Sequence, residues 1–484
     1  MEAHSDIEIK DLFPLDTGDL LETPLIWRNE CLDVHGDVFF NGPAKFGNGA
    51  FRYKHWLDGD GYLQKIRLCE RPTICGKFVK TKKRTEELAA GRPIYRAFGT
   101  AFYGDKVSQF TAIENPINVN VSPWGNDLLA WGEGSQPYLI DSSSLETIGS
   151  WGIEQNIGPF ERMSGHPKMC PFNGSLIIFS LVYQDQGAFI EFSEFPRNSI
   201  STDQGGAKLD SFRVPLEQSF SVHDFALTQG FVLMVLHPYF TERELVMKKN
   251  KSILDSLRWF ENLPTQMLVV PRLNPNSYYF VDIPSKYVIH WMNCRESGDE
   301  LICDLIEYMR PLYNQYTPLA SPYNNLSQGR CQRIIVNVEK KRVVQEISRL
   351  TTSYPDFPAI QHAVGQQKLT ERFWCLGIAG YRGGQGNFFN QVVSGSFISD
   401  ETECWLAPKG VFVCSEPLLI PTKGGSEMLL AVQFSDLVKK ERGMHFFSPS
   451  SISHGPLGSL IFPCALPFPL HGFWREPNRP GVIQ

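Results

Sequence analysis

Short runs of apolar residues, separated by polar turns, recur along the whole chain. The segments "SLIIFSLVYQDQGAFIEFSEFP" and "HDFALTQGFVLMVLHP" each place strand-length apolar runs on the two sides of a short polar turn. The segments "YVIHWMNCRESGDELICDLIEY" and "RCQRIIVNVEKKRVVQEIS" repeat this arrangement further along. Two such runs joined by a turn are typical of a β-hairpin. Hairpins at this density predict an all-β fold.

The length of the chain narrows the architecture. No stretch of linker composition divides the 484 residues, so we expect one domain over residues 1–484. That many antiparallel strands exceed one β-sandwich, whereas a β-propeller protects its sheet edges by arranging sheets around an axis. We find no sequence repeat, so the pattern predicts a propeller without giving the number of blades.

One segment departs from the strand pattern. In "ERELVMKKNKSILDSLRWFENLP", residues 242–264, apolar residues fall roughly on one side of a helix beside a basic flank (apolar Ile253, Leu254, Leu257, Trp259 and Phe260; basic Lys248, Lys249, Lys251 and Arg258). One interpretation is a helix packed over the end of the barrel. The other is a helix that dips into a membrane surface beside a substrate entrance.

Composition and charge exclude several classes of protein. The hydrophobic fraction of 42% and the charged fraction of 20% are those of a globular protein, and the net charge of −6 gives no reason to expect a nucleic-acid partner. The 11 cysteines include no C-x-x-C pair, which is typical of reduced thiols in a cytosolic chain. The start lacks the apolar core of a secretory signal, and no apolar run is long enough to span a bilayer. We therefore expect a cytoplasmic protein that is peripherally associated with membranes.

Four histidines share one kind of setting. His166, His223, His290 and His471 each lie at the end of a strand-like run or in a tight apolar turn, in "SGHPKMCP", "FSVHDFAL", "YVIHWMNC" and "PLHGFW". Any one of them alone is typical of a hydrogen-bonded core or turn residue. Their separations of 57, 67 and 181 residues do not suit a zinc finger. They suit ligands that come from different blades and point to one central axis.

The sequence motifs around these histidines resemble those of the carotenoid cleavage oxygenase family, which includes apocarotenoid oxygenases, stilbene-cleaving oxygenases and the retinoid isomerase. "NVNVSPWGNDLLAWGEGSQPY" is similar to its N-T-N-V strand and E-G-G-x-P-Y turn, "GHPKMCP" to A-H-P-K-x-D-P, and "VHDFALT" to H-D-F-A-I-T. "IHWMNCRE" resembles H-H-x-N-A-F-E, "SEPLLIP" resembles G-E-P-x-F-V-P, and "PLHGFW" resembles the closing P-x-H-G-x-W. These six matches run in family order from residue 118 to residue 474. The resemblance implies a seven-bladed β-propeller with a cap of loops and helices over an apolar tunnel.

The resemblance also implies a metal site. His166, His223, His290 and His471 would bind one Fe(II) per chain, and neutral imidazoles suit ferrous iron. Three carboxylate side chains would orient the imidazole rings (Glu133, Asp356 and Glu416). Asp356 stands where the family usually has Glu, one methylene longer, so it could act through a water or leave one histidine less constrained.

The choice of substrate rests on two further positions. Stilbene-cleaving members bind a phenol through a Lys and a Tyr, and the corresponding positions here are Gly132 and Phe98. Without these polar groups, an apolar polyene fits better than a phenol. We expect aromatic side chains in the wall of the tunnel (Phe98, Phe102, Tyr103 and Trp291).

These features together predict an Fe(II) dioxygenase that splits one C=C bond of a carotenoid or apocarotenoid with O₂, giving two carbonyl products. No organic cofactor is implied, and the partners would be the polyene, O₂ and a membrane surface contacted through about 242–264, with the chain acting as a monomer. The alternatives are a stilbene-cleaving oxygenase, an O₂-independent isomerase on the same iron site, and a propeller that only binds a carotenoid.

Overall fold

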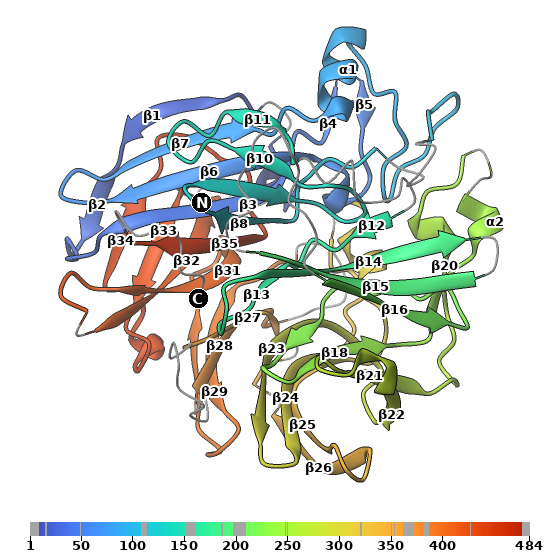
Figure 1. Ribbon diagram of the computed structural model, residues 1–484. Coiled ribbons are helices and arrows are strands. Elements are labelled where there is room, and N and C mark those ends of the chain that lie inside the picture. The colour runs from blue at the N-terminus through green and yellow to red at the C-terminus, as the bar shows by residue number, and fades with distance from the viewer. Residues whose placement is uncertain are drawn as a thin grey trace.

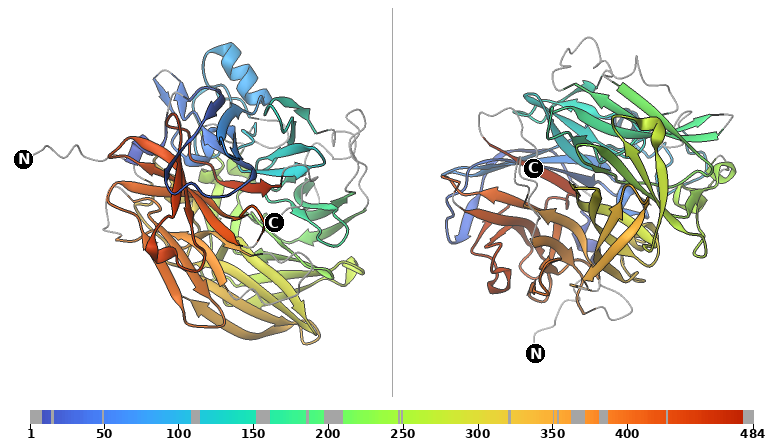
Figure 2. Two further views of the ribbon diagram at one scale, coloured as in Figure 1. Left: turned by 90° about the vertical axis from the view of Figure 1, so that its left-hand side faces the viewer. Right: turned by 60° about the horizontal axis from the view of Figure 1, so that its bottom comes forward.

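Seven antiparallel sheets of four or five strands surround a central axis in this computed structural model (Figure 1). The structure describes residues 9–14, 17–48, 50–107, 114–151, 161–184, 187–196, 210–246, 248, 250–319, 322–349, 351–352, 354–361, 372–380, 387–425 and 427–476. Two further views show the sheets fanned around the axis like the blades of a propeller (Figure 2). The predicted all-β fold and the seven-bladed propeller are both confirmed.

The blades follow one another along the chain. Blade 1 contains β1 (Leu20–Pro24), β7 (Thr73–Phe78), β6 (Asp60–Leu68), β3 (Gly36–Ala44) and β35 (His471–Arg475). Blade 2 contains β11 (Thr147–Ser150), β10 (Tyr138–Ile140), β9 (Asp127–Trp131) and β8 (Asn120–Trp124). Blade 3 contains β12 (Glu161–Met163), β13 (Lys168–Met169), β14 (Leu176–Gln184), β15 (Gly187–Phe195) and β16 (Asp210–Leu216). Blade 4 contains β17 (Ala226–Leu227), β18 (Phe231–Leu236), β21 (Thr265–Pro271) and β22 (Tyr279–Ile283).

Blade 5 contains β23 (Tyr287–Ser297), β24 (Glu300–Tyr308), β25 (Gly329–Asn337) and β26 (Arg342–Arg349). Blade 6 contains β27 (Asp356–Ile360), β28 (Arg372–Gly377), β29 (Gln391–Ser396) and β30 (Thr402–Leu406). Blade 7 contains β2 (Ile26–Asn29), β34 (Gly458–Ile461), β33 (Glu441–Phe447), β32 (Met428–Asp436) and β31 (Val411–Pro421). Two small hairpins, β4 (Gly47–Asn48) with β5 (Phe51–Arg52) and β19 (Tyr239–Thr241) with β20 (Leu257–Trp259), lie in the connections.

The hydrophobic core lies in the wedges between neighbouring blades. For example, Ile177 and Phe179 of blade 3 pack with Val232 and Met234 of blade 4 in one buried cluster. Leu233 of blade 4 packs with other blade 4 and blade 5 residues in the next cluster. Because each strand faces a neighbouring sheet on both sides, its apolar residues form the nearly continuous runs seen in the sequence rather than a strict alternation.

The ring closes at blades 1 and 7. The strand β35 pairs antiparallel with β3, where His471 lies opposite Asn41. The strand β2 pairs with β34 of blade 7, and β1, which comes directly before β2, pairs with β7 of blade 1. Strands from distant parts of the chain therefore complete both blades, so no sheet edge opens at the seam.

The connections between strands at one end of the propeller form a cap. Short helical elements occur in these connections and elsewhere: α1 (Lys82–Ala90), α2 (Arg243–Val246), η1 (Ile9–Leu12), η2 (Trp56–Asp58), η4 (Leu254–Ser256), η5 (Pro275–Ser277), η6 (Tyr313–Tyr316) and η7 (Ile452–His454). None of the helices in the described ranges is long and apolar enough to cross a membrane.

The helix predicted for residues 242–264 does not form. The segment instead contains α2, η4 and β20, and β20 pairs with β19, while Met247 and Lys249 lie outside the described residues. Asn250 adopts a positive φ of 61°, which interrupts a right-handed helix. The pairing with β19 then gives the backbone hydrogen bonds that a helix would have supplied.

Candidate metal centre and cavity

The four predicted histidines converge at the axis from four blades. His166 lies in the turn between β12 and β13, His223 lies just before β17, His290 lies within β23, and His471 begins β35. All four are buried, with at most 9% of each residue exposed. The structure therefore brings together side chains that are as many as 305 residues apart.

The rings face one another closely enough to share one ion. The Nε2 atoms of His166 and His223 are 2.8 Å apart. Ring centroids lie 4.6 Å apart for His166 and His471 and 5.2 Å apart for His290 and His471. Ligand atoms of His166, His290 and His471 all lie within 4.8 Å of one another, and those of Glu133, His166 and His223 form a second group of this kind. This arrangement can hold a metal ion.

Each of three histidines has its own carboxylate behind it. Asp356 Oδ1 lies 2.7 Å from His290 Nδ1. Glu133 Oε1 lies 2.9 Å from His223 Nδ1, and Glu416 Oε2 lies 3.4 Å from His471 Nδ1. At His290 and His471 the carboxylate forms a hydrogen bond that holds the proton on Nδ1 and leaves the lone pair on Nε2, whereas Glu133 is close to His223 Nδ1 without a hydrogen bond. Asp356 thus reaches its histidine directly, although it is one methylene shorter than the expected Glu, and no water is needed between them.

Irregular backbone aims these side chains at the axis. The ladder of β23 shifts register between Val288 and Trp291, and the ladders of β27 and β31 shift after Asp356 and after Cys414. Phe357 and Ser415, which adjoin Asp356 and Glu416, have positive φ angles of 51° and 81°. Bulges re-aim individual side chains in a sheet, and they occur here on three innermost strands at the level of the centre.

A fourth carboxylate cross-links the backbone behind the histidines. Asp224, the neighbour of His223, is paired with Lys168 Nζ at 2.7 Å and accepts a hydrogen bond from the backbone N–H of Trp291 at 3.1 Å. Asp224 therefore joins the segments that carry His166, His223 and His290. These two contacts of Asp224 hold blades 3, 4 and 5 together next to the histidines.

Burial sets the charge of the imidazoles. Desolvation, reinforced by the neighbouring histidines, lowers the pKa of His166 well below its usual value. Desolvation also lowers the pKa of His471, with Glu416 opposing it. At His290 burial favours the neutral ring, but the Asp356 carboxylate outweighs burial and raises its pKa. His166 and His471 are therefore neutral near pH 7, the form that binds metal ions.

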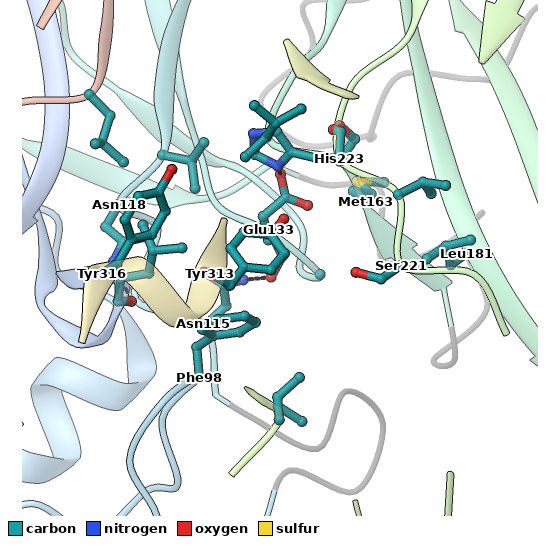
Figure 3. A pocket seen from close by; sticks show the side chains of 18 of the residues that line it. Phe98, Asn115, Asn118, Glu133, Met163, Leu181, Ser221, His223, Tyr313 and Tyr316 are labelled. Atoms are coloured by element: carbon teal, nitrogen blue, oxygen red, sulfur yellow. Dashed lines mark hydrogen bonds and ion pairs between the residues drawn. The ribbon is translucent and has the colours of Figure 1, made fainter. Parts of the chain in front are cut away.

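A cavity of about 150 Å³ opens beside the histidines (Figure 3). His223, His290 and His471 line it together with Glu133. The cap supplies much of the rest of the wall from the connections that precede β6, β8, β21 and β25 (Trp56, Leu57, Phe98, Asn115, Pro116, Asn118, Thr241, Ile253, Leu257, Tyr313 and Tyr316). The wall is mostly apolar, as in sites that bind organic molecules.

Of the four aromatic residues expected in the tunnel wall, only Phe98 lines this cavity. Tyr103 is 90% exposed, and Phe102 packs edge-to-face on Phe51 away from the histidines. Trp291 is buried in the wedge between blades 4 and 5. The prediction for these three residues was wrong, because proximity in sequence does not place a side chain on the same face as its neighbour.

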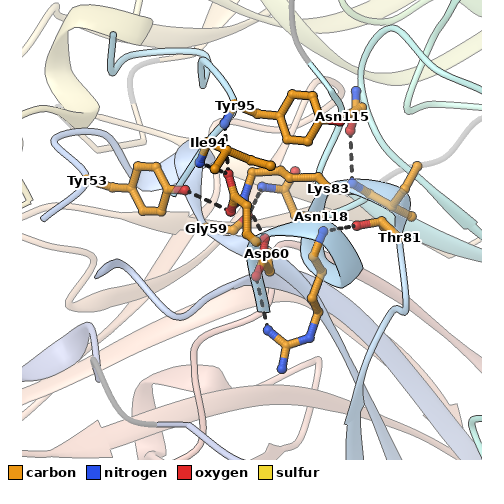
Figure 4. Close-up of polar contacts among 12 residues, drawn as sticks. Tyr53, Gly59, Asp60, Thr81, Lys83, Ile94, Tyr95, Asn115 and Asn118 are labelled. Atoms are coloured by element: carbon orange, nitrogen blue, oxygen red, sulfur yellow. Dashed lines mark hydrogen bonds and ion pairs between the residues drawn. The ribbon is translucent and has the colours of Figure 1, made fainter. Parts of the chain in front are cut away.

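Buried ion pairs hold the connection that carries Phe98 (Figure 4). Lys83 in α1 is paired with Asp60 at 2.7 Å and with Glu87 at 2.9 Å. Glu87 in turn accepts hydrogen bonds from the backbone N–H groups of Ile94 and Tyr95, each at 3.0 Å. Burial alone would lower the pKa of Lys83, but the two carboxylates raise it well above its usual value, so Lys83 stays charged.

Several residues of the cavity wall were not found from the sequence. Tyr313 and Tyr316 belong to η6, in "RPLYNQYTP", whose pattern gives no sign that it covers an axis. Ser221 could have been found, because it stands two residues before His223, and alternate residues of extended chain face the same side. This two-residue spacing from His223 is the only feature of the sequence that indicates a place for Ser221 in the cavity wall.

Known proteins with similar sequences identify the family of this chain. The family model described as "RPE65: Retinal pigment epithelial membrane protein" matches residues 32–476. The chain is 24% identical to "Apocarotenoid-15,15'-oxygenase" of Synechocystis sp., covering 92% of this chain and 91% of the relative. It is also 24% identical to "Carotenoid cleavage dioxygenase 7, chloroplastic" of Oryza sativa subsp. japonica, covering 93% and 90% of the two chains.

Solved structures share the fold. The crystal structure of cobalt-substituted Synechocystis apocarotenoid oxygenase superposes with a TM-score of 0.82 at 19% identity and covers 96% of this chain and 98% of that one. The crystal structure of a chimera of that oxygenase with RPE65 superposes with a TM-score of 0.83, also at 19% identity, over the same shares of the two chains. From the match of the family model over nearly the whole described propeller, this chain belongs to the family of RPE65 and the carotenoid cleavage oxygenases.

Proposed function

We propose that this protein is an Fe(II)-dependent dioxygenase that cleaves one C=C bond of a carotenoid or apocarotenoid with O₂. The observation that carries the proposal is the convergence of four buried imidazoles, three of them with a carboxylate on Nδ1. The named relatives, which are oxygenases and dioxygenases that act on carotenoids or apocarotenoids, support it.

The donor set fits ferrous iron. His290 Nε2 is buried and has no hydrogen-bond partner in the described part of the chain, although a buried polar atom ordinarily has one. Imidazole nitrogens bind Fe(II) well, and a set with no anionic ligand leaves the ion its full charge. His166, His223, His290 and His471 would hold one Fe(II) per chain, which when bound supplies the activation of O₂.

The remaining residues bind and orient. Asp356 and Glu416 keep the Nδ1 protons of His290 and His471 in place, so their Nε2 lone pairs point to the ion, and Glu133 places a negative charge 2.9 Å from His223 Nδ1. Glu133 also accepts a hydrogen bond from the backbone N–H of Gly165 at 3.1 Å, which fixes the turn that carries His166. The apolar wall excludes water and holds one double bond of an extended substrate beside the histidines.

The surroundings of Gly132 favour a polyene over a stilbene. A Cβ atom at this position would lie 2.1 Å from Asn115 Oδ1 and 2.9 Å from Ile117 Cα. A lysine that binds a phenol cannot occupy this position unless Asn115 moves, and Phe98 offers no hydroxyl. Unpartnered phenol groups are costly to bury, so a polyene is the better substrate.

We also propose that the protein collects its substrate at a membrane surface and acts as a monomer. Two apolar side chains in the segment 242–264 remain exposed, Phe260 at 45% and Leu263 at 47%. Arg258 in the same segment has a 44% exposed side chain, which forms an ion pair with Glu242 at 3.3 Å. Apolar side chains next to basic ones bind anionic lipid surfaces without a membrane-spanning helix.

The test is anaerobic reconstitution with Fe(II), followed by incubation in air with carotenoids, apocarotenals and hydroxystilbenes, with products identified by mass and by ¹⁸O₂ labelling. We expect two carbonyl fragments from a polyene, with label from O₂, and at least tenfold slower turnover of stilbenes. Isomerised or hydrolysed products without label would assign the site to an O₂-independent isomerase. Tight polyene binding without any product would assign it to a carrier.

A further inference from the structure

Two hydroxyl groups in the cavity wall are available to a ligand. Ser221 and Thr241 both line the cavity, and neither hydroxyl has a hydrogen-bond partner within the described ranges. Figure 3 shows the Ser221 hydroxyl turned toward the interior of the cavity. A hydroxyl that loses water without gaining a partner destabilises a site, so these two groups are suited to a polar atom of a ligand.

Several other polar side chains of the wall already have protein partners. Asn118 Nδ2 donates to the carbonyl oxygens of Leu57 and Gly59 at 2.9 and 2.7 Å. Asn115 donates to the carbonyl oxygen of Glu133, and Ser164 Oγ donates to that of His223 at 3.0 Å. A ligand oxygen therefore finds free hydroxyl partners at Ser221 and Thr241.

Backbone pairing fixes these two residues next to each other. The N–H of Ser221 donates to the carbonyl of Tyr239 at 2.7 Å, and the N–H of Thr241 donates to the carbonyl of Ser219 at 2.8 Å. Ser221 and Thr241 are therefore diagonal neighbours on one face of a short antiparallel ladder, a spacing that a ligand oxygen can bridge.

Further contacts make this ladder rigid. His237 Nε2 donates to the carbonyl oxygen of Ser221 at 2.7 Å, and the rings of Phe220 and Phe240 pack edge-to-face with centroids 5.0 Å apart. A preorganised pair of hydroxyls loses little entropy when it binds, so it discriminates between ligands more sharply than mobile groups would.

We infer that Ser221 and Thr241 form an oxygen-binding subsite, and that the substrate is a polyene with a hydroxyl or carbonyl group at this end of the cavity. The inference rests on the proposed function and adds the polar group of the substrate to it. Because a hydroxyl both donates and accepts, the pair can bind either an alcohol or an aldehyde. A site built to hydrogen-bond such a group discriminates against the analogue that lacks it.

The test compares two C20 polyenes that differ only in a terminal CH₂OH or CH₃ group. Their dissociation constants are measured under anaerobic conditions on Fe(II)-loaded wild-type protein and on Ser221→Ala, Thr241→Val and the double variant. We expect each single substitution to lower the preference for the alcohol three- to tenfold, and the double variant to lower it at least tenfold. Affinity for the hydrocarbon should stay within twofold, which also shows that the variants are folded.

Ser219→Ala is the matched control, because Ser219 is on the same ladder but does not line the cavity. The control should keep the wild-type preference within twofold. An unchanged preference for the alcohol in the double variant would overturn the subsite. The proposed function would still stand in that case if wild-type protein cleaves polyenes in air. Wild-type protein that binds neither polyene would overturn both.

Discussion

Removing the Asp356 carboxylate tests the metal centre at its most buried contact. Asp356 is fully buried, and its Oδ1 lies 2.7 Å from His290 Nδ1 and accepts a hydrogen bond from the backbone N–H of Phe357 at 2.8 Å. In Asp356→Ala the imidazole of His290 loses the group that fixes its orientation and its Nδ1 proton. The backbone of Phe357, held in the left-handed region, also loses its partner.

The expected size of the effect follows from this double loss. Removing a carboxylate behind a metal-binding histidine typically weakens metal affinity 10–100-fold, which corresponds to about 1.4–2.8 kcal/mol. Asp356→Asn should cost less, since an amide oxygen can still accept both hydrogen bonds and only the charge is lost. Asp356→Glu adds a methylene to a site with no exposed surface, and overpacking of this kind costs ~1–3 kcal/mol of folding stability.

Competition against a fluorescent chelator, with Fe(II) under anaerobic conditions, measures the affinity directly. Asp400→Ala is the control, because the Asp400 side chain is 95% exposed and pairs only with Arg349 among the described contacts. Wild-type affinity in Asp356→Ala, in protein with an unchanged melting temperature, would refute the role of Asp356 and weaken the assignment of His290 as a ligand.

Three further results are expected. Phe260→Ser combined with Leu263→Ser should reduce pelleting with anionic liposomes severalfold, and unchanged pelleting would place the membrane contact elsewhere. Burial lowers the pKa of His55 to about 4, so the stability it contributes is complete above its unfolded pKa of 6.5 and is lost as the pH falls toward 4. When the pH falls from 7 to 4, the free energy of unfolding measured by urea titration should decrease by about 3 kcal/mol less in His55→Gln than in wild type. Equal decreases would contradict a neutral His55 imidazole in the folded protein. Gly132→Lys should lower the free energy of unfolding by ~1–3 kcal/mol in the same titrations, because its Cβ meets Asn115; a wild-type value would show that Asn115 moves freely.

The sequence was sufficient for the strands but not for their irregularities. Alternating apolar runs and turns predict hairpins because each hairpin is a local structure, and the structure confirms an all-β propeller. The bulges at β23, β27 and β31 depend on neighbouring strands, so the direct contact of Asp356 with His290 could not be predicted from the length of its side chain. The four histidines were found from the order of their surrounding motifs, because their spacing suits ligands from different blades but does not by itself show that they converge.

The segment 242–264 shows how a tertiary contact overrides a local pattern. Its apolar residues have helical spacing, yet Leu257–Trp259 is extended because it pairs with Tyr239–Thr241. As a result Leu257 faces the cavity and Trp259 packs against the core, while Phe260 remains 45% exposed. The residues available to a membrane are therefore fewer than the sequence pattern indicated.

The strand that closes the ring also carries a histidine of the centre. His471 is the first residue of β35. Among the described strands β35 is the last along the chain, and it pairs with β3 of blade 1. The donor set is therefore incomplete until blade 1 has received its last strand, and a partly folded chain offers at most three of the four imidazoles. Tight metal uptake should report that the propeller has closed. During synthesis this would delay tight metal binding until the ring has closed.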